Sequence, residues 1–449
     1  MPEILRSVGL DVGTTSTQLI VSRLTVENRA SAFAVPELEI ADREIMYKSP
    51  VHFTPLQGES LVDAPALREL VEEEYRAAGI SRDEVDTGAV IITGETSRKE
   101  NARAVLEALS DLAGDFVVAT AGPDLESVLA ARGAGAAEYS EKTGKTVLHM
   151  DIGGGTSNLA CIRDGKIVAT TCLNVGGRLI KYGPDCVITY VSPVLEGIAS
   201  PKVGDIVTKG LLEAVAEILV EALEMAAGRR TAGPLLQKLT TEEAEPGWKI
   251  PEKATVSFSG GVADCIASCQ SWQRYGDLGP VLGQAIRKSA LCGGDYVLGK
   301  ETIRATVIGA GCHSVRLSGS TVFYRNVRFP LKNLPVASVS DWEREAIRQA
   351  LKKQEGSAVL AMPGLESPRY SRVVELAEDL LKTGPGPYYV CLEQDMAKAL
   401  GQALAVRTGE DIPILCIDRI RVGEGTYLDI GAPVGPALPV VVKTLILGR

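Results

Sequence analysis

Two stretches of the chain share one pattern: residues 10–20 read LDVGTTSTQLI, and residues 150–160 read MDIGGGTSNLA. In each, short β-prone runs lie on both sides of a polar, glycine-containing turn that begins with an aspartate, Asp11 or Asp151, and this arrangement predicts a β-hairpin. Asp151 follows Asp11 by 140 residues. Because that offset is too long for a solenoid repeat, it predicts two domains of equivalent fold.

The segments around the two hairpins alternate strand signals with helix signals. Strands are expected at 89–93, 115–120, 254–258 and 302–308, helices at 67–78, 99–109 and 207–227, and a surface loop at 228–253. The first of these helices has Pro65 in its first turn and Gly79 just past its end, which are favoured helix boundaries. Strands that alternate with helices predict an α/β fold.

Beyond Gly319 helix and strand signals continue to alternate. Ser340, with Glu343 three residues later, forms a capping box that predicts a helix to about Lys353. A helix at 394–406 and strands at 388–392, 414–417, 426–430 and 440–447 complete the segment. Prolines at 433, 436 and 439 predict that the last stretch is bent or lies at a sheet edge.

Composition excludes several classes of protein. The 449 residues carry a net charge of −10, so the chain repels phosphate backbones and offers no basic stripe for nucleic acid. No apolar run approaches the roughly 20 residues that span a bilayer, and the first residues form no secretory signal, so we expect a soluble, cytoplasmic protein. The nine cysteines include no CxxC pair and are expected to be reduced and mostly buried. With three histidines, a structural zinc site is not expected.

The two turns themselves indicate phosphate binding. Residues without β-carbons let several backbone N–H groups face one cavity, which forms an anion site, and the hydroxyls of Thr14, Thr15 and Thr156 add donors. Asp11 and Asp151 at the mouths of the turns suit a hydrated Mg²⁺, which takes one or two carboxylates and keeps several waters. Either turn, taken alone, is also compatible with a tight hairpin that binds nothing.

Together, the turns resemble the two phosphate loops of the ATPase superfamily that contains actin, heat-shock chaperones and sugar kinases. Three further segments follow in that superfamily's order: 258–263 (FSGGVA) is similar to its adenosine loop, 306–311 (TVIGAG) to its second connecting helix, and 124–137 to its first connecting helix. The resemblance implies a two-lobed actin-like ATPase built on duplicated ribonuclease-H-like domains, with inserted subdomains and a C-terminal α/β extension. The implied parts are a first ATPase lobe over 1–145, a second over 146–320 and the extension over 321–449.

The same resemblance implies ATP or ADP with Mg²⁺ as cofactors and assigns candidate site residues. Those for the cofactor are Asp11, Gly13, Thr14, Thr15, Gly153, Gly154, Gly155 and Thr156 around the phosphates, Ser259, Gly260 and Gly261 around the adenosine, and Gly309 in the hinge helix. Asp11 and Asp151 are the implied metal ligands. Glu126 and Asp151 are the implied catalytic pair, with Glu126 orienting the metal or the attacking water.

One departure from the superfamily pattern bears on catalysis. Its chaperones carry an acid two places after the threonine of the second loop, where this chain has Asn158, and the glutamate that activates water in its phosphatases is missing near that point. Hydrolysis is therefore expected to be slow. Two alternatives stay open: a small-molecule kinase or phosphatase of the same superfamily, and a nucleotide-binding scaffold for an assembly.

Within the superfamily, long stretches resemble the reactivating factors of ethanolamine ammonia-lyase, the EutA family. These stretches are 8–24, 92–102, 122–136 and 427–445. The resemblance implies a chaperone for an adenosylcobalamin enzyme, in which a slow ATPase supports release of damaged cobalamin so that intact coenzyme can rebind. The lyase is then the partner, a homodimer is allowed, and the implied location is the cytoplasm or an ethanolamine-utilisation bacterial microcompartment.

Overall fold

The chain forms two compact units, which we describe separately. The computed structural model describes residues 3–13, 16–28, 38–57, 61–81, 84–92, 105, 109, 117–120, 123–241, 254–268, 270–313, 315–318, 321–354, 356–365, 368–422, 426–433 and 437–444. Unit 1 takes in the described residues of Met1–Ile92, Arg98–Thr120 and Ser314–Arg449, and unit 2 those of Ala121–His313. The three-part division at 145 and 320 stays a prediction. None of the described helices has the length and apolarity that crossing a membrane requires.

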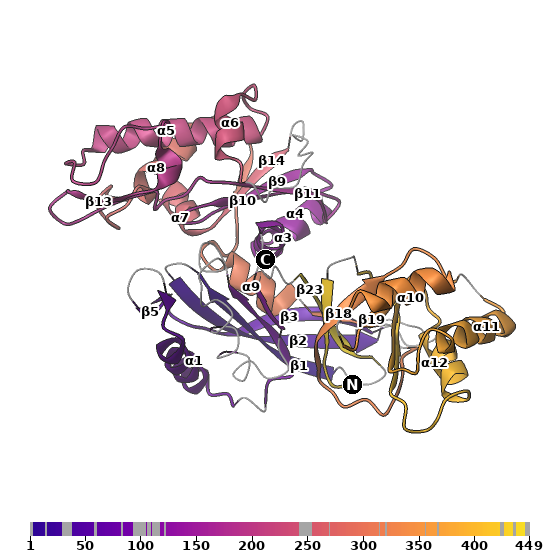
Figure 1. Cartoon of the computed structure of the whole chain (residues 1–449). Helices are drawn as coiled ribbons and strands as arrows, with labels where there is room; N and C mark the ends of the chain where they lie inside the picture. The colour runs from indigo at the N-terminus through magenta and orange to yellow at the C-terminus, as the bar shows by residue number, and fades with distance from the viewer. Residues whose placement is uncertain are drawn as a thin grey trace. The chain divides into compact units, whose positions relative to one another are not determined.

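A sheet of six strands forms the N-terminal part of unit 1 (Figure 1). Its order is β3-β2-β1-β7-β8, with β4 paired to β2. The strands are β1 (Glu3–Val12), β2 (Ser16–Asn28), β3 (Leu38–Lys48), β4 (His52–Phe53), β7 (Thr87–Ile92) and β8 (Val117–Thr120). β1, β2 and β3 are antiparallel, whereas β1, β7 and β8 are parallel.

Helix α1 (Ala64–Ala78) covers one face of this sheet and matches the helix predicted from 67 to 78. The side chain of Asp63 accepts a hydrogen bond from the Ala66 amide at its start, and Gly79 ends it in the left-handed conformation at φ 67°. Its Leu67 packs with Val8 of β1 in the buried core. The short strands β5 (Leu56–Gln57) and β6 (Leu61–Val62) pair with each other just before it. Of the helix predicted over 99–109, only two residues fall within the described part.

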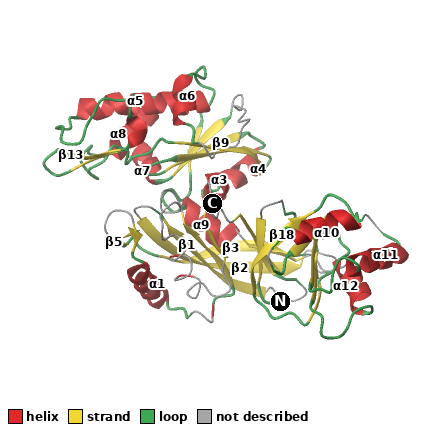
Figure 2. Cartoon of the chain, viewed as in Figure 1, coloured by secondary structure: helices red, strands yellow, loops and turns green. Residues whose placement is uncertain are grey.

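The sheet of unit 2 repeats this arrangement strand for strand. Its order is β11-β10-β9-β14-β15, again with three antiparallel strands followed by parallel ones. The strands are β9 (Val147–Ile152), β10 (Ser157–Arg163), β11 (Lys166–Leu173), β14 (Thr255–Ser259) and β15 (Tyr296–Leu298). Figure 2 shows that both units mix helices with strands, so the predicted α/β class with duplicated domains is confirmed.

The duplication extends to the cross-strand pairs of the two hairpins. Asp11 lies opposite Gln18 between β1 and β2, and Asp151 lies opposite Asn158 between β9 and β10. Both partners follow their aspartate by seven residues, so the 140-residue offset read from the sequence holds along the whole hairpin. The two glycine turns are therefore equivalent positions of one repeated sheet.

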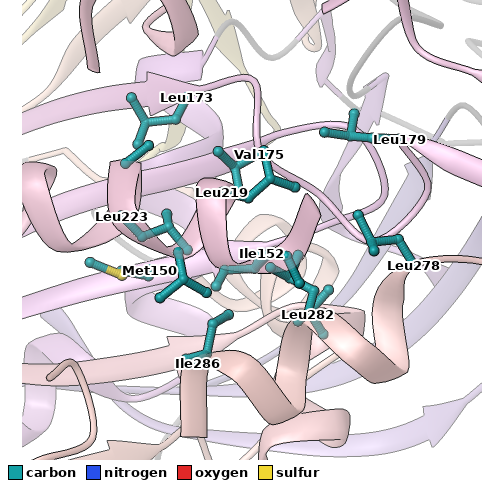
Figure 3. Close-up of a cluster of buried hydrophobic side chains, with 14 of the residues drawn as sticks. Met150, Ile152, Leu173, Val175, Leu179, Leu219, Leu223, Leu278, Leu282 and Ile286 are labelled. Atoms are coloured by element: carbon teal, nitrogen blue, oxygen red, sulfur yellow. The ribbon is translucent and has the colours of Figure 1, made fainter. Parts of the chain in front are cut away.

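The main core of unit 2 lies on one face of its sheet, under α5 (Lys209–Ala226), α7 (Gly261–Ala267) and α8 (Gly279–Lys288). Figure 3 shows Met150 and Ile152 of β9 in one cluster with Leu219 and Leu223 of α5 and with Leu282 of α8. Successive side chains of a strand point to opposite faces. His149 and Asp151 therefore lie on the other face, where α3 (Pro123–Gly133), α4 (Ala136–Thr143) and α9 (Ala305–His313) pack.

Helices α3 and α9 cross with their backbones in direct contact. A β-carbon on Gly309 would lie 2.1 Å from the carbonyl oxygen of Leu129, and one on Gly133 would lie 1.8 Å from that of Ala305. Neither distance is compatible with a side chain. Two overlapping predictions cover this region: a strand over 302–308 and a connecting helix over 306–311. The structure forms helix α9 here, so the predicted strand is wrong. The apolar run fits a buried helix whose glycines admit a neighbouring backbone.

We expect Gly309→Ala to destabilise unit 2 strongly, because the added methyl group meets a backbone oxygen that cannot move aside. The expected loss is about 3 kcal/mol or more, which lowers the thermal midpoint of a unit of this size by roughly 6–12 °C. Gly210→Ala is the matched control, since a β-carbon on this helical glycine of α5 meets nothing within 4 Å. Thermal unfolding that is equal for the two variants would contradict the described crossing.

The C-terminal part of unit 1 is a sheet of eight strands in the order β16-β23-β22-β18-β19-β20-β21-β17. The strands are β16 (Val315–Leu317), β17 (Phe323–Arg325), β18 (Leu331–Ser338), β19 (Val359–Met362), β20 (Tyr388–Leu392), β21 (Ile414–Ile417), β22 (Thr426–Ile430) and β23 (Pro439–Thr444). The helices between its parallel strands are α10 (Arg344–Lys352), α11 (Tyr370–Leu381) and α12 (Ala397–Ala405), and they share one apolar core with the sheet. A second cluster lines the other face.

Three further sequence expectations need correction. Helix α10 starts at Arg344, with Glu343 as its N-cap and no side-chain capping bond, so Ser340 does not cap it. The expected surface loop over 228–253 contains helix α6 (Pro234–Leu239), whose first turn accepts a proline because that amide is unpaired in any helix. Strand β23 pairs with β16 and β22 and is not an edge, since Pro439 is its first residue, where a missing amide is tolerated.

Smaller elements complete unit 2. Strands β12 (Ile180–Tyr182) and β13 (Ile188–Val191) form a separate hairpin that is followed by the short 3₁₀ helix η3 (Pro193–Leu195). Of the eight cysteines in the described ranges, six are buried, as the sequence predicted for most of them.

Candidate functional site

The second glycine turn is closed on itself and supported from behind by backbone hydrogen bonds. The Gly153 amide donates to the Thr156 carbonyl at 2.9 Å. The Gly153 carbonyl accepts from the Gly177 amide at 2.9 Å, and the Gly154 carbonyl accepts from the Arg178 amide at 2.7 Å. These bonds fix the orientation of two successive peptide planes in the turn.

The fixed peptide planes aim N–H groups at the open side of the turn. In a trans peptide the carbonyl and the following N–H point in opposite directions. Because the carbonyls of Gly153 and Gly154 face the supporting segment, the amides of Gly154 and Gly155 face away from it. In the described part of the chain these two amides donate no hydrogen bond. Two unpaired N–H groups that face the same side can bind an anion such as a phosphate oxygen.

The supporting segment also brings a cation to the turn. A β-carbon on Gly176 would lie 2.3 Å from the Gly154 carbonyl oxygen, so only glycine allows this approach. The side chain of Arg178 runs beside the turn, with its Cδ 3.4 Å from the β-carbon position of Gly154. Its Nε lies 3.5 Å from Asp277 Oδ2. Burial raises the pKa of Asp277. The hydrogen bond from the Gly279 amide and the positive charge of Arg178 lower this pKa but do not cancel the effect of burial.

Asp151, at the mouth of the turn, is held by two hydroxyl groups. Ser259 Oγ of β14 donates to Asp151 Oδ1, and Thr306 Oγ1 of α9 donates to Oδ2 at 3.4 Å. Burial raises the pKa of the Asp151 carboxyl to about 6, against the lowering effect of these two hydrogen bonds. Asp151 therefore holds its charge at neutral pH in a site that favours a compensating cation.

A buried histidine stands behind this carboxylate. His149 Nε2 lies 2.9 Å from Ser259 Oγ, and His149 Nδ1 lies 3.1 Å from Ser257 Oγ. Burial lowers the pKa of His149 to about 3, so the ring is neutral under physiological conditions. The ring thus takes part in hydrogen bonding and carries no charge.

The predicted adenosine loop packs directly on the second hairpin. Gly260 adopts φ 84°, and a β-carbon there would lie 2.3 Å from the carbonyl oxygen of Ile152. Its amide donates to the Thr302 carbonyl at 3.0 Å. Gly261 begins α7 and has open space where its β-carbon would lie.

Gly260→Ala is expected to separate this loop from β9, because the conformation and the contact both exclude a β-carbon. We expect a loss of about 3 kcal/mol or more in the free energy of unfolding. Urea unfolding of unit 2 measures this, with Gly261→Ala as the control that keeps the wild-type midpoint. A Gly260→Ala protein that unfolds with the control would show that the loop does not touch β9.

The first glycine turn has the same closure but a different surrounding. The Gly13 amide donates to the Ser16 carbonyl at 2.9 Å, as in the second turn. Thr54 Oγ1 donates to the Gly13 carbonyl at 2.8 Å and lies 3.0 Å from Thr17 Oγ1. Asp11 is half-buried at the end of β1. Thr14 and Thr15 lie outside the described residues, so their predicted role remains a prediction.

Comparison with known proteins places the whole chain in a family. A family model described as "Ethanolamine utilisation protein EutA" matches residues 3–448. The chain belongs to the EutA family. Its relatives include the "Ethanolamine ammonia-lyase reactivase EutA" of Escherichia coli K12, which is 39% identical over 466 residues and 98% of both chains. The protein of the same description from Salmonella typhimurium LT2 is 39% identical over 471 residues, again with 98% of both chains covered.

Solved structures show more distant similarity to this EutA-family chain. A Ppx/GppA family member from Aquifex aeolicus is 14% identical with a TM-score of 0.44, over 68% of this chain and 97% of that one. The ethanolamine utilization protein EutJ from Carboxydothermus hydrogenoformans is 18% identical with a TM-score of 0.34, over 69% and 89%.

The donor set of the EutA-family chain fits a hydrated Mg²⁺ better than a closed protein cage. Among the described residues, no group of three or more His, Cys, Asp and Glu side chains is placed to hold a metal ion. One carboxylate beside phosphate oxygens and waters is a common Mg²⁺ environment, and Asp151 supplies such a carboxylate. Asn158, directly opposite, adds a buried Oδ1 that has no hydrogen-bond partner in the described part. That oxygen is suited to accept from a metal-bound water.

The structure brings together part of the predicted site. Asp151, Gly153, Gly154, Gly155, Thr156, Ser259, Gly260 and Gly261 form one neighbourhood in unit 2. Glu126 lies on α3 and is half-buried, and Gly309 lies on α9 against α3, so their roles at a nucleotide remain predictions.

The sequence reasoning missed three residues of this neighbourhood: His149, Ser257 and Thr306. The signal for the first two was a polar side chain at an inner position of a buried strand, on the same face as Asp151 in β9 and Ser259 in β14. Thr306 lay within a quoted motif, but its side chain was not singled out.

Proposed function

We propose that this chain is a reactivating factor for ethanolamine ammonia-lyase and that it works with Mg²⁺ and ATP. The observation that carries the proposal is the full-length match, 39% identical over 98% of both chains, to relatives described as reactivases of that enzyme. The matched length includes the C-terminal segment that a generic ATPase pattern leaves unexplained. Association with an ethanolamine-utilisation microcompartment belongs to the same proposal.

The nucleotide part of the proposal rests on the two hairpins, each considered in its own unit. In unit 2, the amides of Gly154 and Gly155 would bind phosphate oxygens, with Thr156 as an added donor and Arg178 as a neighbouring positive charge. Gly260 and Gly261 would pass beneath the adenosine. In unit 1, Asp11, Gly13, Thr14 and Thr15 would take the equivalent phosphate and metal roles.

The metal would be held through Asp151 and its waters. When bound, Mg²⁺ neutralises charge on the phosphate oxygens and so lowers the cost of placing them beside a buried carboxylate. Asp151 would hold that ion through its carboxylate, and the Asn158 Oδ1 would accept a hydrogen bond from a bound water. Glu126 is the proposed further acid that orients water.

Slow hydrolysis follows from the chemistry of Asn158. An amide oxygen accepts a hydrogen bond but does not take up a proton at neutral pH. It therefore orients an attacking water without acting as a general base, a function that contributes typically 10²–10⁴-fold where it is present. A slow ATPase gives the nucleotide-bound state a long life, which suits a protein that must stay docked on a partner.

Reactivation then needs no covalent chemistry on the lyase. ATP and ADP differ in their contacts with the turns, and a ligand shifts a conformational equilibrium only by its differential affinity for the two states. The γ-phosphate is the group that supplies this difference. We propose that the two nucleotide states present different surfaces to the lyase, and that the ATP-dependent state opens a path for the damaged cobalamin to leave.

The test is recovery of cyanocobalamin-blocked ethanolamine ammonia-lyase. The lyase is incubated with this protein, adenosylcobalamin and Mg-ATP, in parallel with an Asp151→Ala variant and with a reaction that lacks nucleotide. Activity that returns only with the wild-type protein and ATP supports the proposal. A lyase that stays inactive while the protein binds ATP would rule out this partner.

One observation favours a second candidate, a scaffold that binds nucleotide without turnover. It is the amide at Asn158, where a general base is missing. The scaffold predicts nucleotide affinity, no release of phosphate, and assembly that does not depend on hydrolysis. Phosphate release during reactivation separates the two candidates, and rapid phosphoryl transfer to an added small molecule would instead favour a kinase or phosphatase.

A further inference from the structure

A line of polar side chains runs through the sheet of unit 2 and ends at Asp151. Ser257 and Ser259 come from β14, His149 and Asp151 from β9, and the strands are paired so that His149 lies beside Ser257 and Asp151 beside Ser259. His149 and Ser259 are fully buried and Ser257 is 1% exposed. The hydroxyl and imidazole groups contact one another in sequence, with His149 between the two serines.

Counting protons fixes the direction of these hydrogen bonds. An ionised carboxylate only accepts, so the single hydroxyl proton of Ser259 is donated to Asp151. Ser259 Oγ must then accept from His149 Nε2, which therefore carries the ring proton. His149 Nδ1, left without a proton, accepts from Ser257. Every donor in the line points toward Asp151, and such chains polarise one another.

The duplicated sheet shows that the fold does not require this line. In unit 1 the positions equivalent to His149, Ser257 and Ser259 are Gly9, Ala89 and Ile91, because Gly9 pairs with Ala89 and Asp11 with Ile91 in the same parallel register. The same backbone is thus built without these three polar side chains. Buried polar side chains cost free energy unless they are satisfied, so the line is an addition specific to the second hairpin.

We propose that His149 and Ser259 are positioning residues for Asp151. They fix the rotation of its carboxylate, so that the lone pairs left free by Ser259 and Thr306 face the Mg²⁺ of a bound nucleotide. This inference rests on the proposed nucleotide function. In this proposal the Ser259 hydroxyl hydrogen-bonds the Asp151 carboxylate and does not contact adenosine. Only the backbone of Gly260 and Gly261 would then contact the adenosine.

The first test reads the ring tautomer and needs no nucleotide. The chain has three histidines, so ¹⁵N NMR of imidazole-labelled protein, with His149→Gln to assign the signal, identifies His149. The expected result is a neutral ring protonated at Nε2 and unprotonated at Nδ1 at pH 7. A ring protonated at Nδ1 alone would leave Nε2 without a proton for Ser259, reverse the donor to Asp151 and overturn the proposal; protonation at Nε2, whatever the state of Nδ1, supports it.

The second test separates positioning of Asp151 from contact with adenosine. Ser259→Ala should weaken binding of Mg-ADP by about tenfold or more, the effect typical of a hydrogen bond to a charged group, and leave binding of adenosine alone unchanged. Loss of adenosine affinity to the same extent would place the hydroxyl on the nucleoside and overturn the assignment. Mg-ADP affinity equal to that of wild type would overturn it as well.

Two histidine variants provide the rescue control. The side-chain amide of Gln reaches the place of Nε2 and keeps a donor to Ser259, whereas that of Asn reaches only the place of Nδ1. His149→Gln should therefore retain most of the Mg-ADP affinity and His149→Asn should lose it, even where thermal midpoints are equal. Equal affinities for the two would mean that His149 is only a packing residue. If the wild-type protein binds no Mg-ADP, the proposed function fails, whereas a wrong tautomer in a protein that binds Mg-ADP defeats only the positioning role.

Discussion

Asp151→Asn is expected to abolish ATP-dependent recovery of the lyase and to leave the protein folded. The amide keeps an oxygen that accepts from Ser259, so the hydrogen bonding of the hairpin is largely preserved, but the charge that attracts a cation is gone. We expect Mg-ATP affinity to fall by about 100-fold, as for loss of a charged partner in a water-poor site. Calorimetric titration with and without Mg²⁺ measures this, and only the Mg²⁺-dependent part of the affinity should disappear.

Stability separates this loss from unfolding. Burial disfavours the charged form of Asp151, as its raised pKa indicates, so removing the charge should leave the thermal midpoint of the nucleotide-free protein at or above that of wild type. Asp295→Asn is the control, because this acid of unit 2 is well exposed, with its side chain 86% accessible. Reactivation that survives Asp151→Asn would remove the second hairpin from the mechanism.

Asn158→Asp is expected to accelerate ATP hydrolysis by at least about tenfold, because it places a carboxylate that accepts a proton where the chain has an amide. The gain should appear only with Mg²⁺. Without the ion, the new carboxylate lies directly opposite Asp151 across the hairpin, and two like charges so placed destabilise the pair. We therefore expect the variant to have a lower thermal midpoint without Mg-nucleotide and a recovered one with it.

Although the Asn158→Asp variant should hydrolyse ATP faster, it should reactivate less lyase. If the long-lived ATP state is what keeps the protein docked, faster turnover shortens it and recovers less lyase per ATP consumed. Asn158→Ala, which removes the amide without adding a base, should show no gain in phosphate release. Equal hydrolysis by the two variants would mean that no water is oriented from this position.

The hairpins could be predicted from sequence because their signals are local. An aspartate, glycines and hydroxyls within seven residues define a turn and its anion-binding character, and the 140-residue repeat adds the duplication. The polar line behind Asp151 could not be predicted, because it joins β9 to β14 over more than a hundred residues and depends on a one-residue register between parallel strands. A lone histidine in an apolar strand carries no indication of its partner.

Errors in the secondary structure have similar physical causes. The run from 302 to 308, TIRATVI, is short and alternates polar with apolar residues, which favours a strand. The structure instead forms helix α9 there, which crosses α3. The capping box at Ser340 failed because the helix begins only at Arg344, with Glu343 extended as its N-cap, which puts Ser340 too far from the first turn. Pro439 indicated a sheet edge because proline has no amide to donate to a neighbouring strand. It is the first residue of β23, where the missing amide is tolerated in an inner strand.

The construction of unit 1 from the two ends of the chain has a consequence for synthesis. Leu5 and Leu24 of the N-terminal hairpin and Ile40 of β3 share a buried cluster with Val441 of β23. About 400 residues must be translated between them, which takes roughly 20–80 s at 5–20 residues per second. Unit 2, contiguous over the described residues of Ala121–His313, can fold while that time passes. The N-terminal hairpin instead emerges with apolar side chains that β23 does not yet cover. We therefore expect the nascent chain to be most prone to aggregation or chaperone capture until β23 leaves the ribosome.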